Sequence, residues 1–248
     1  KTGAPVLAKS VDATRLSVPN QPPEFDPSVL FGFPHKEVYV DPIARAMEPA
    51  SAVEAPPKVR VHASRDQALQ FVKFLDDRGL LTLAPAEKVR RSHLCGAFGL
   101  VKDLHKDRLI LDARPANMLE DTLHTWTRTM GAVQALLQHE IQPNFNMYFS
   151  GTDFRDYYYC FRVTSRRAWR NAMRLPLTPS QVASFQCFSE DMWQEPVLFP
   201  CLKTLAMGDN NAVELGQYAH LKIGLDAGII FPRELLTTHG RAPRDRKS

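Results

Sequence analysis

Two carboxylates lie three residues apart inside a strongly aromatic stretch, YFSGTDFRDYYYCFRVT, which spans residues 148–164. An ionised carboxylate removed from water needs a cationic partner, hydrogen bonds or a metal. If Asp153 follows a strand and a tight turn, it is well placed to hold a divalent cation beside a phosphate, as in metal-dependent phosphoryl transfer. Helix capping, or pairing of Asp153 and Asp156 with nearby arginines, is the commoner arrangement, and this stretch alone favours it.

A second charged group occupies RLILDARPAN, which begins at Arg108. Arg108, Asp112 and Arg114 alternate with other residues, so an extended strand would carry them on one face. Asp112 could then hold one arginine while the other points at a phosphate. Lys102 and Lys106 flank the preceding turn and would add positive charge there. A surface strand with a local salt bridge explains the same spacing equally well.

A third motif is the Met207-Gly208 step in LKTLAMGDNNAVELGQYAH, which precedes a predicted helix N-terminus. Glycine lets a backbone approach a ligand closely, and helix N-termini favour anions. This step is therefore a natural place for the chain to approach a nucleotide.

The composition indicates the class of protein. With 248 residues, 44% of them apolar, the chain can bury a core. The net charge of +4 is too small to indicate a polyanion partner. Four scattered cysteines predict neither a zinc site nor a disulfide framework. Since no apolar run approaches the ~20 residues that cross a bilayer, we expect no membrane partner and a soluble intracellular protein, in the cytoplasm, the nucleus or an organelle. A first residue other than Met indicates a processed chain or a fragment.

Several elements must position these motifs. The proline-rich residues 1–57 predict an extended arm or linker with one short helix at 42–47, and residues 58–248 form the remainder. Ser64 and Gln67 form a capping box before a helix predicted over 65–78. Further predictions are an extended segment at 80–83, a hairpin of 95–101 with 108–112, helices at 121–141 and 165–174, strands at 146–149, 185–188 and 197–205, and a helix capped by Asp209 that runs to 227. This mixed order favours an α+β fold.

The order of the motifs resembles a known family. A hairpin with lysine, then R-x-x-x-D-x-R-x-x-N, then a strand ending in D-x-x-D and aromatics, then L-x-M-G before a helix, is similar to the fingers and palm of a retroelement reverse transcriptase. The similarity covers residues 94–227, and it implies that residues 58–248 are the fingers and partial palm of such an enzyme, ending before the second catalytic aspartate motif. It implies a right-hand polymerase fold with an incomplete palm sheet, RNA-directed DNA polymerase (nucleotidyltransferase) chemistry, an RNA or DNA template–primer with dNTP, and Mg²⁺ or Mn²⁺.

The resemblance also implies roles for single residues. In the palm, Asp153 would be the catalytic aspartate and a ligand of both metal ions, with the Phe154 carbonyl assisting. Asp156 and Tyr157 would offer backbone amides to the triphosphate, and Tyr158 would be the steric gate that excludes a 2′-hydroxyl.

In the fingers, Arg108 and Lys102 would grip the phosphates, while Asp112 and Arg114 would shape the hairpin around the template. Met207 and Gly208 would read the nascent base pair. Four arginines of the helix predicted over 165–174 would contact nucleic-acid phosphates, and a solvated helix face is the alternative explanation for them (Arg166, Arg167, Arg170 and Arg174).

Two features depart from the family pattern. Tyr157 stands where better-known members have a small residue, which would crowd the triphosphate pocket. The family also has a second aspartate pair beyond the Met-Gly step, and no such pair follows Met207 here. Because two-metal polymerisation needs that pair, we expect a piece of a longer polyprotein or a truncated copy, inactive alone. The alternatives are a non-catalytic module that binds nucleic acid or builds a ribonucleoprotein, and an α+β protein with coincidental motifs.

Overall fold

The computed structural model describes residues 7–48, 54–131, 144, 153–232 and 235. Within them the chain is an α+β protein with two antiparallel sheets, as predicted: β1 (Leu81–Pro85) pairs with β4 (Leu198–Leu202), and β2 (Gly96–Val101) with β3 (Asp107–Asp112). The α-helices are α1 (His35–Val40), α2 (Arg65–Asp76), α3 (Arg114–Leu119), α5 (Ser165–Arg170), α6 (Pro179–Val182) and α7 (Ala212–Asp226). The 3-10 helices are η1 (Pro27–Val29), η2 (Pro42–Arg45), η4 (Ala86–Lys88), η5 (Arg91–His93), η6 (Thr127–Thr129), η7 (Tyr157–Cys160) and η8 (Glu190–Gln194). No helix in these described ranges is long and apolar enough to cross a bilayer.

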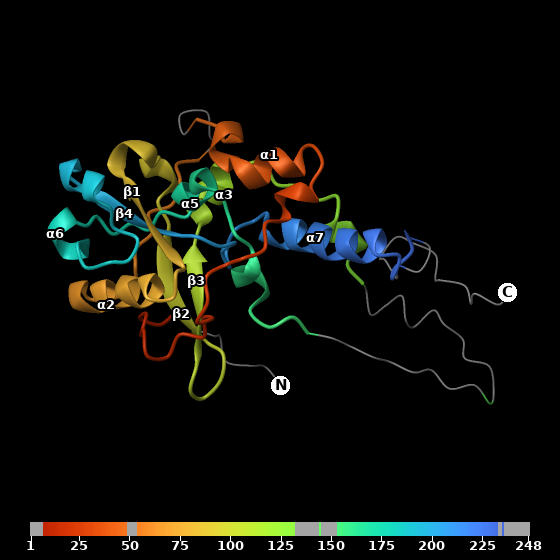
Figure 1. Ribbon diagram of the computed structural model, residues 1–248, viewed down its shortest axis with the longest axis horizontal. Helices are drawn as coiled ribbons and strands as arrows, with labels where there is room; N and C mark the ends of the chain where they lie inside the picture. The colour runs from red at the N-terminus through yellow and green to blue at the C-terminus, as the bar shows by residue number, and fades with distance from the viewer. Residues whose placement is uncertain (1–6, 49–53, 132–143, 145–152, 233–234, 236–248) are drawn as a thin grey trace.

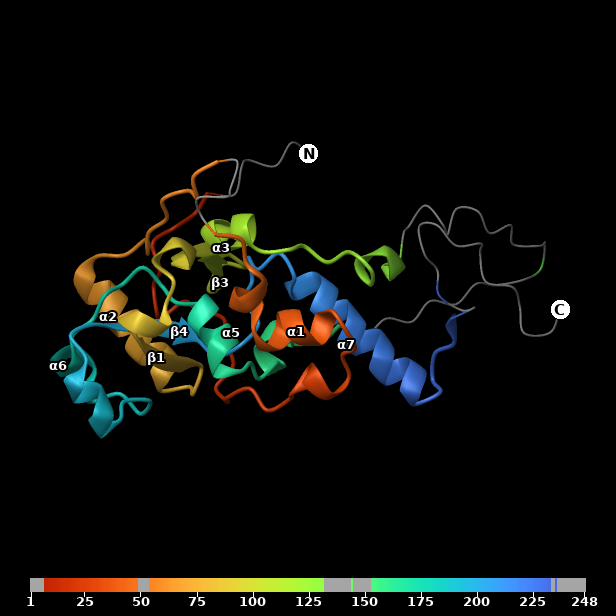
Figure 2. The ribbon, with the colours of Figure 1, turned by 90° about the horizontal axis from the view of Figure 1, so that it is seen from above.

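The helices are spread along the molecule, with α1, α3 and α5 near its middle (Figure 1; Figure 2). In both views α2 and α6 lie at one end and α7 at the other (Figure 1; Figure 2). The main core packs α2 against both sheets through side chains such as Phe71, Leu81 and Leu111. A smaller core joins α1 to α7 through Tyr39 and Leu215. Both sheets therefore contribute side chains to the main core, which holds them in place.

The predicted hairpin is confirmed, since β2 and β3 pair along their whole lengths. At its turn, Asp103 Oδ1 accepts hydrogen bonds from the amides of His105 (2.9 Å) and Lys106 (2.8 Å). An aspartate that bonds its own backbone in this way stabilises a tight turn. The polar sequence KDLHKD therefore closes the hairpin and sends its two apolar runs back into the core.

The predicted α2 is also confirmed, because Ser64 and Gln67 form the expected capping box. The helix ends at Asp76, two residues before the predicted end, and Gly79 follows with a φ of +65°. β1 then leaves the helix as the predicted extended segment.

The helix predicted over 121–141 is wrong where the structure describes it. Residues 121–131 form no α-helix, only a turn at 125–126 and the 3-10 helix η6, and residues 132–141 lie outside the described part. The amides of Trp126 and Thr127 donate to Glu214 at 2.7–2.9 Å, and the amide of Leu123 donates to Asn211 Oδ1 (2.9 Å). These amides bond side chains at the start of α7 instead of carbonyls of their own helix.

The strand predicted over 185–188 is also wrong. Its chain forms a turn because the buried Asp76 carboxylate accepts hydrogen bonds from the amides of Gln186 (2.7 Å) and Cys187 (3.0 Å). The helix predicted over 165–174 ends at Arg170, since Ala172 and Met173 pair with β4 instead. The strand predicted at 197–205 corresponds to β4, and the one predicted at 146–149 lies outside the described residues.

The proline-rich N-terminal region packs onto the rest of the chain. Val11 and Leu16 belong to the main core, and Phe31 and Tyr39 contribute to the core shared with α7. The short helix predicted at 42–47 is the 3-10 turn η2. Residues 7–48 are therefore not a free linker, because their apolar side chains bury against both cores.

Candidate functional site

The Met207-Gly208 step lies against the end of β3. The Leu111 amide donates to the Met207 carbonyl (2.9 Å), and a Cβ built on Gly208 would lie 2.0 Å from the Leu111 carbonyl oxygen. Gly208 has a φ of +112°, which L side chains rarely adopt. Only glycine allows this approach, so two motifs that are distant in the sequence meet here.

Asn117 fastens this contact. Its Nδ2 donates to the Gly208 carbonyl (2.7 Å), and its Oδ1 accepts from Arg170 Nη2 (2.7 Å) and from the Asn210 amide (3.1 Å). Asn117 is the last letter of R-x-x-x-D-x-R-x-x-N, to which the sequence assigned no role. Its place in the motif was the only hint in the sequence of a role for Asn117. The structure shows that Asn117 positions the turn at Gly208.

A buried ionic network continues from Asn117. Arg170 pairs with Glu120 (2.8 Å) and lies 3.7 Å from Asp209, while Arg167 pairs with Asp209 (2.5 Å). Both arginines are fully buried. The prediction that they contact nucleic acid is therefore wrong for these two, because their guanidinium groups are already held inside the protein by carboxylates.

Each charged group of this network stabilises the ionised form of its partners. Burial alone would raise the pKa of Asp209, but the positive charges of Arg170 and Arg167 hold it below its ordinary value of 3.8. Burial alone would lower the pKa of Arg170, but the charges of Asp209 and Glu120 raise it. Asp209 also accepts the Asn211 amide (2.8 Å) just before α7, whose N-cap is Asn211 rather than the predicted Asp209.

The other two basic residues of this region remain at the surface. Arg166 is exposed and forms an ion pair with Asp41. Arg174 is exposed after the end of α5, with no side-chain partner among the described residues. Both remain predictions for phosphate contacts, with Arg174 the freer of the two.

A pocket of about 410 Å³ opens where the hairpin meets Gly208, with Phe98, Ile110, Asp112 and Arg114 in its walls. Asp112 and Arg114 form the predicted pair through two hydrogen bonds of 2.7 Å. The Arg114 hydrogen bond is the main reason why the pKa of Asp112 falls below its ordinary value. The prediction that one strand face carries Asp112 and Arg114 is wrong, however, because β3 ends at Asp112 and Arg114 begins α3.

The two predicted phosphate-gripping residues are both exposed on the hairpin. Arg108 projects from β3, and Lys102 Nζ donates to Ser17 Oγ (2.9 Å) at the turn. Neither residue lines the 410 Å³ pocket. They offer positive charge on the same hairpin that forms part of its wall.

The predicted metal ligand lies at the surface. Asp153 and Phe154 are exposed, and neither lines the pocket at Gly208. Asp156 has a left-handed backbone (φ +53°), and its carboxylate lies 3.4 Å from Arg155 Nε. The ion-pair interpretation therefore describes Asp156. Among the residues that the structure describes, no group of three acidic, histidine or cysteine side chains could hold a metal ion.

Tyr157 and Tyr158 of the aromatic stretch pack against α7. The Tyr157 hydroxyl donates to the Gly216 carbonyl (2.8 Å), and a Cβ on Gly216 would lie 3.0 Å from the Tyr157 ring and 3.5 Å from the Tyr158 ring. Burial raises the pKa of both phenols. The Tyr157 ring is thus used in packing, and its segment is tied to the helix that follows Gly208.

A second buried polar cluster was not predicted from the sequence. His35 Nε2 lies 2.7 Å from Glu214 Oε1, and Glu214 also accepts the Trp126 and Thr127 amides. Burial would raise the pKa of Glu214, but these hydrogen bonds lower it. No local signal could have found the cluster, because its members come from α1, η6 and α7.

The chain was also compared with known proteins. No protein-family model matches it. No curated protein matches it significantly.

Proposed function

We propose that the chain provides the fingers and part of the palm of a reverse-transcriptase-like RNA-directed DNA polymerase. In this proposal the pocket at the end of β3 receives the template base, and exposed Arg108 and Lys102 hold phosphates of the incoming dNTP. Other parts of a longer polyprotein would complete the catalytic site. The binding partners are then an RNA or DNA template–primer and dNTP.

One observation carries this proposal. The R-x-x-x-D-x-R-x-x-N hairpin and the L-x-M-G step touch through Leu111, Met207 and Gly208. A polymerase needs the fingers and the base-pair-reading step side by side, whereas coincidental motifs have no reason to meet. Asn117 and the buried arginines support the same contact from behind.

The proposed metal ligand is Asp153, for Mg²⁺ or Mn²⁺, with the Phe154 carbonyl beside it. Two-metal nucleotidyl transfer needs further carboxylates within reach of the same ions. The described residues supply no such group, so the donor set does not fit a two-metal centre. We therefore derive no catalytic step through a metal and assign the described part a role in binding.

Arg108→Ala should weaken binding of a fluorescently labelled dNTP to the full chain with its template–primer roughly fivefold, because an exposed guanidinium that contacts the triphosphate is lost. Fluorescence anisotropy at several salt concentrations measures the loss. Arg91→Ala, which removes an exposed arginine from η5, serves as the charge-matched control. Equal effects of the two substitutions, or no binding at low salt, would contradict the proposal.

A non-catalytic nucleic-acid-binding module is the second candidate. The observation that favours it is that Lys102, Lys106 and Arg108 are exposed on the β2–β3 hairpin, whereas Asp153 does not line the pocket beside that hairpin. The same assay separates the two candidates. If the unaltered chain binds dNTP and Arg108→Ala weakens that binding, the polymerase proposal is supported; if the chain binds no dNTP and Asp153→Ala leaves strand binding unchanged, the module is supported.

A further inference from the structure

We propose an additional phosphate site, formed by Arg60 and His62, that holds the backbone of a single-stranded nucleic acid beside the pocket at the end of β3. The inference rests on the proposed function. It adds residues that none of the four sequence motifs contains, from a segment before α2.

The segment that carries these residues runs along the edge of β2. Val61 forms a parallel bridge with Ala97, whose amide donates to the Arg60 carbonyl (3.2 Å) and whose carbonyl accepts from the His62 amide (2.8 Å). A Cβ on Gly96 would lie 2.5 Å from the Arg60 carbonyl oxygen, so glycine makes this approach possible. The positions of Arg60 and His62 are therefore fixed by the sheet.

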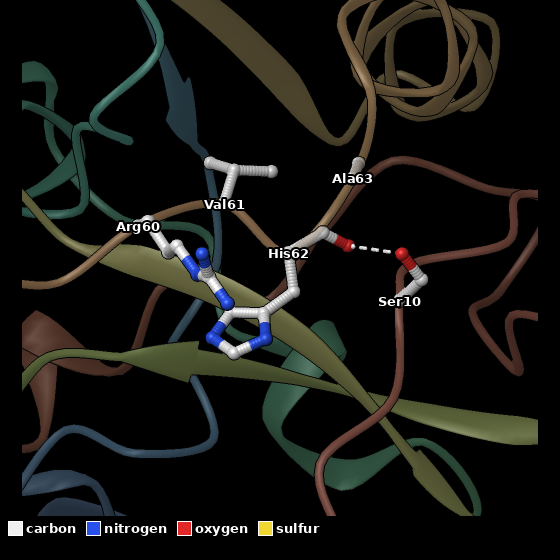
Figure 3. A pocket seen from close by; sticks show the side chains of 5 residues that line it. All are labelled: Ser10, Arg60, Val61, His62 and Ala63. Carbon is white, nitrogen blue, oxygen red and sulfur yellow. Dashed lines mark hydrogen bonds between the residues drawn. The ribbon is translucent and has the colours of Figure 1, made fainter.

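Arg60 and His62 share one pocket. They are two residues apart in an extended segment, so both side chains leave on the same side, and Figure 3 shows the guanidinium beside the imidazole. The pocket has a volume of about 260 Å³ and is completed by Ser10, Val61 and Ala63. Ser10 Oγ donates to the His62 carbonyl (3.0 Å), which ties the N-terminal segment to its wall.

The charge of this pocket is unbalanced. None of its lining residues is acidic. The exposed Arg60 guanidinium has no ion-pair partner in the described part of the chain. A free guanidinium presents a planar set of donors that matches phosphate. An anion between Arg60 and His62 would supply the missing negative charge.

The pocket adjoins the one at the end of β3, because His62 lines both. In the second pocket the Phe98 ring lies 6.0 Å from the His62 ring, between centroids. The negative charge of Asp112 there is already matched by Arg114. Single-strand sites combine an aromatic platform for bases with cations for the backbone. Two adjoining open pockets suit a strand that continues past Gly208 better than a ligand that ends there.

Arg60→Ala should weaken binding of a labelled single-stranded RNA of about 16 nucleotides roughly fivefold in the full chain, equally for different sequences. The salt slope should fall by about 0.7, the value for one contact to a single strand. Fluorescence anisotropy measures both. Arg128→Ala, which removes an exposed arginine from η6 outside both pockets, should change neither. Arg60→Lys should recover part of the affinity, and melting curves of all variants should match that of the unaltered chain.

The remaining outcomes overturn the inference in distinguishable ways. If the unaltered chain binds RNA and Arg60→Ala binds it equally well, the phosphate site is wrong and the proposed function stands. If the unaltered chain binds no RNA, both are wrong. If Arg60→Ala loses affinity for TTP but not for the strand, the site holds a free nucleotide and the strand assignment is wrong. If Arg60→Ala fails to fold, an unchanged salt slope in Arg60→Gln would overturn the site.

Discussion

Gly208→Ala should lower the free energy of unfolding by about 3 kcal/mol or more, from backbone strain and a steric clash together. The added Cβ would lie 2.0 Å from the Leu111 carbonyl oxygen, so the turn would have to move away from β3. The φ of +112° adds strain because L side chains rarely adopt it. Urea unfolding followed by circular dichroism measures the loss. Binding of template–primer should fall with it, since the pocket wall moves.

The chain contains a matched control for this substitution. Gly228 also has a positive φ, +66°, but a Cβ there meets no atom within 4 Å. Gly228→Ala should therefore cost only the backbone strain, about 1 kcal/mol. If both substitutions cost the same, the close contact between Gly208 and Leu111 is not needed for stability, and the contact between the two motifs loses its support.

Asp209→Ala should lower the free energy of unfolding by about 3–5 kcal/mol, the cost of leaving buried charges without their partner. Arg167 would lose its carboxylate at 2.5 Å, and Arg170 would keep Glu120 as its carboxylate partner. The substitution also removes the oxygen that accepts the Asn211 amide before α7. The midpoint and slope of urea unfolding report the change.

An exposed ion pair gives the comparison. Asp226 pairs with Lys222 on the surface of α7, where solvent screens the interaction. Asp226→Ala should cost less than about 0.5 kcal/mol. Similar losses for Asp209→Ala and Asp226→Ala would show that the buried network contributes little to stability.

Local rules predicted the elements whose hydrogen bonds stay local. The capping box of Ser64 and Gln67 begins α2, and the polar turn at Asp103 closes the hairpin. The pair of Asp112 and Arg114 followed from a spacing of two residues. In each case both partners lie within three residues of one another, so a short stretch of sequence contains the whole interaction.

Long-range partners explain what the sequence could not predict. The stretch at 121–131 has an apolar pattern typical of a helix, yet Glu214 takes the amides of Trp126 and Thr127. The basic pattern of α5 is typical of a nucleic-acid surface, yet Glu120 and Asp209 bury Arg170 and Arg167. Nothing in either stretch reveals these carboxylates, because they come from other elements.

Photocrosslinking tests the central claim most directly. A template–primer whose first unpaired template base is 4-thiouridine would be irradiated with the full chain, and the crosslinked peptides identified by mass spectrometry. We expect crosslinks within residues 110–114 and at Gly208, which line the pocket at the end of β3. Crosslinks confined to other parts of the chain, or none under conditions in which the complex forms, would contradict the assignment of this pocket to the template.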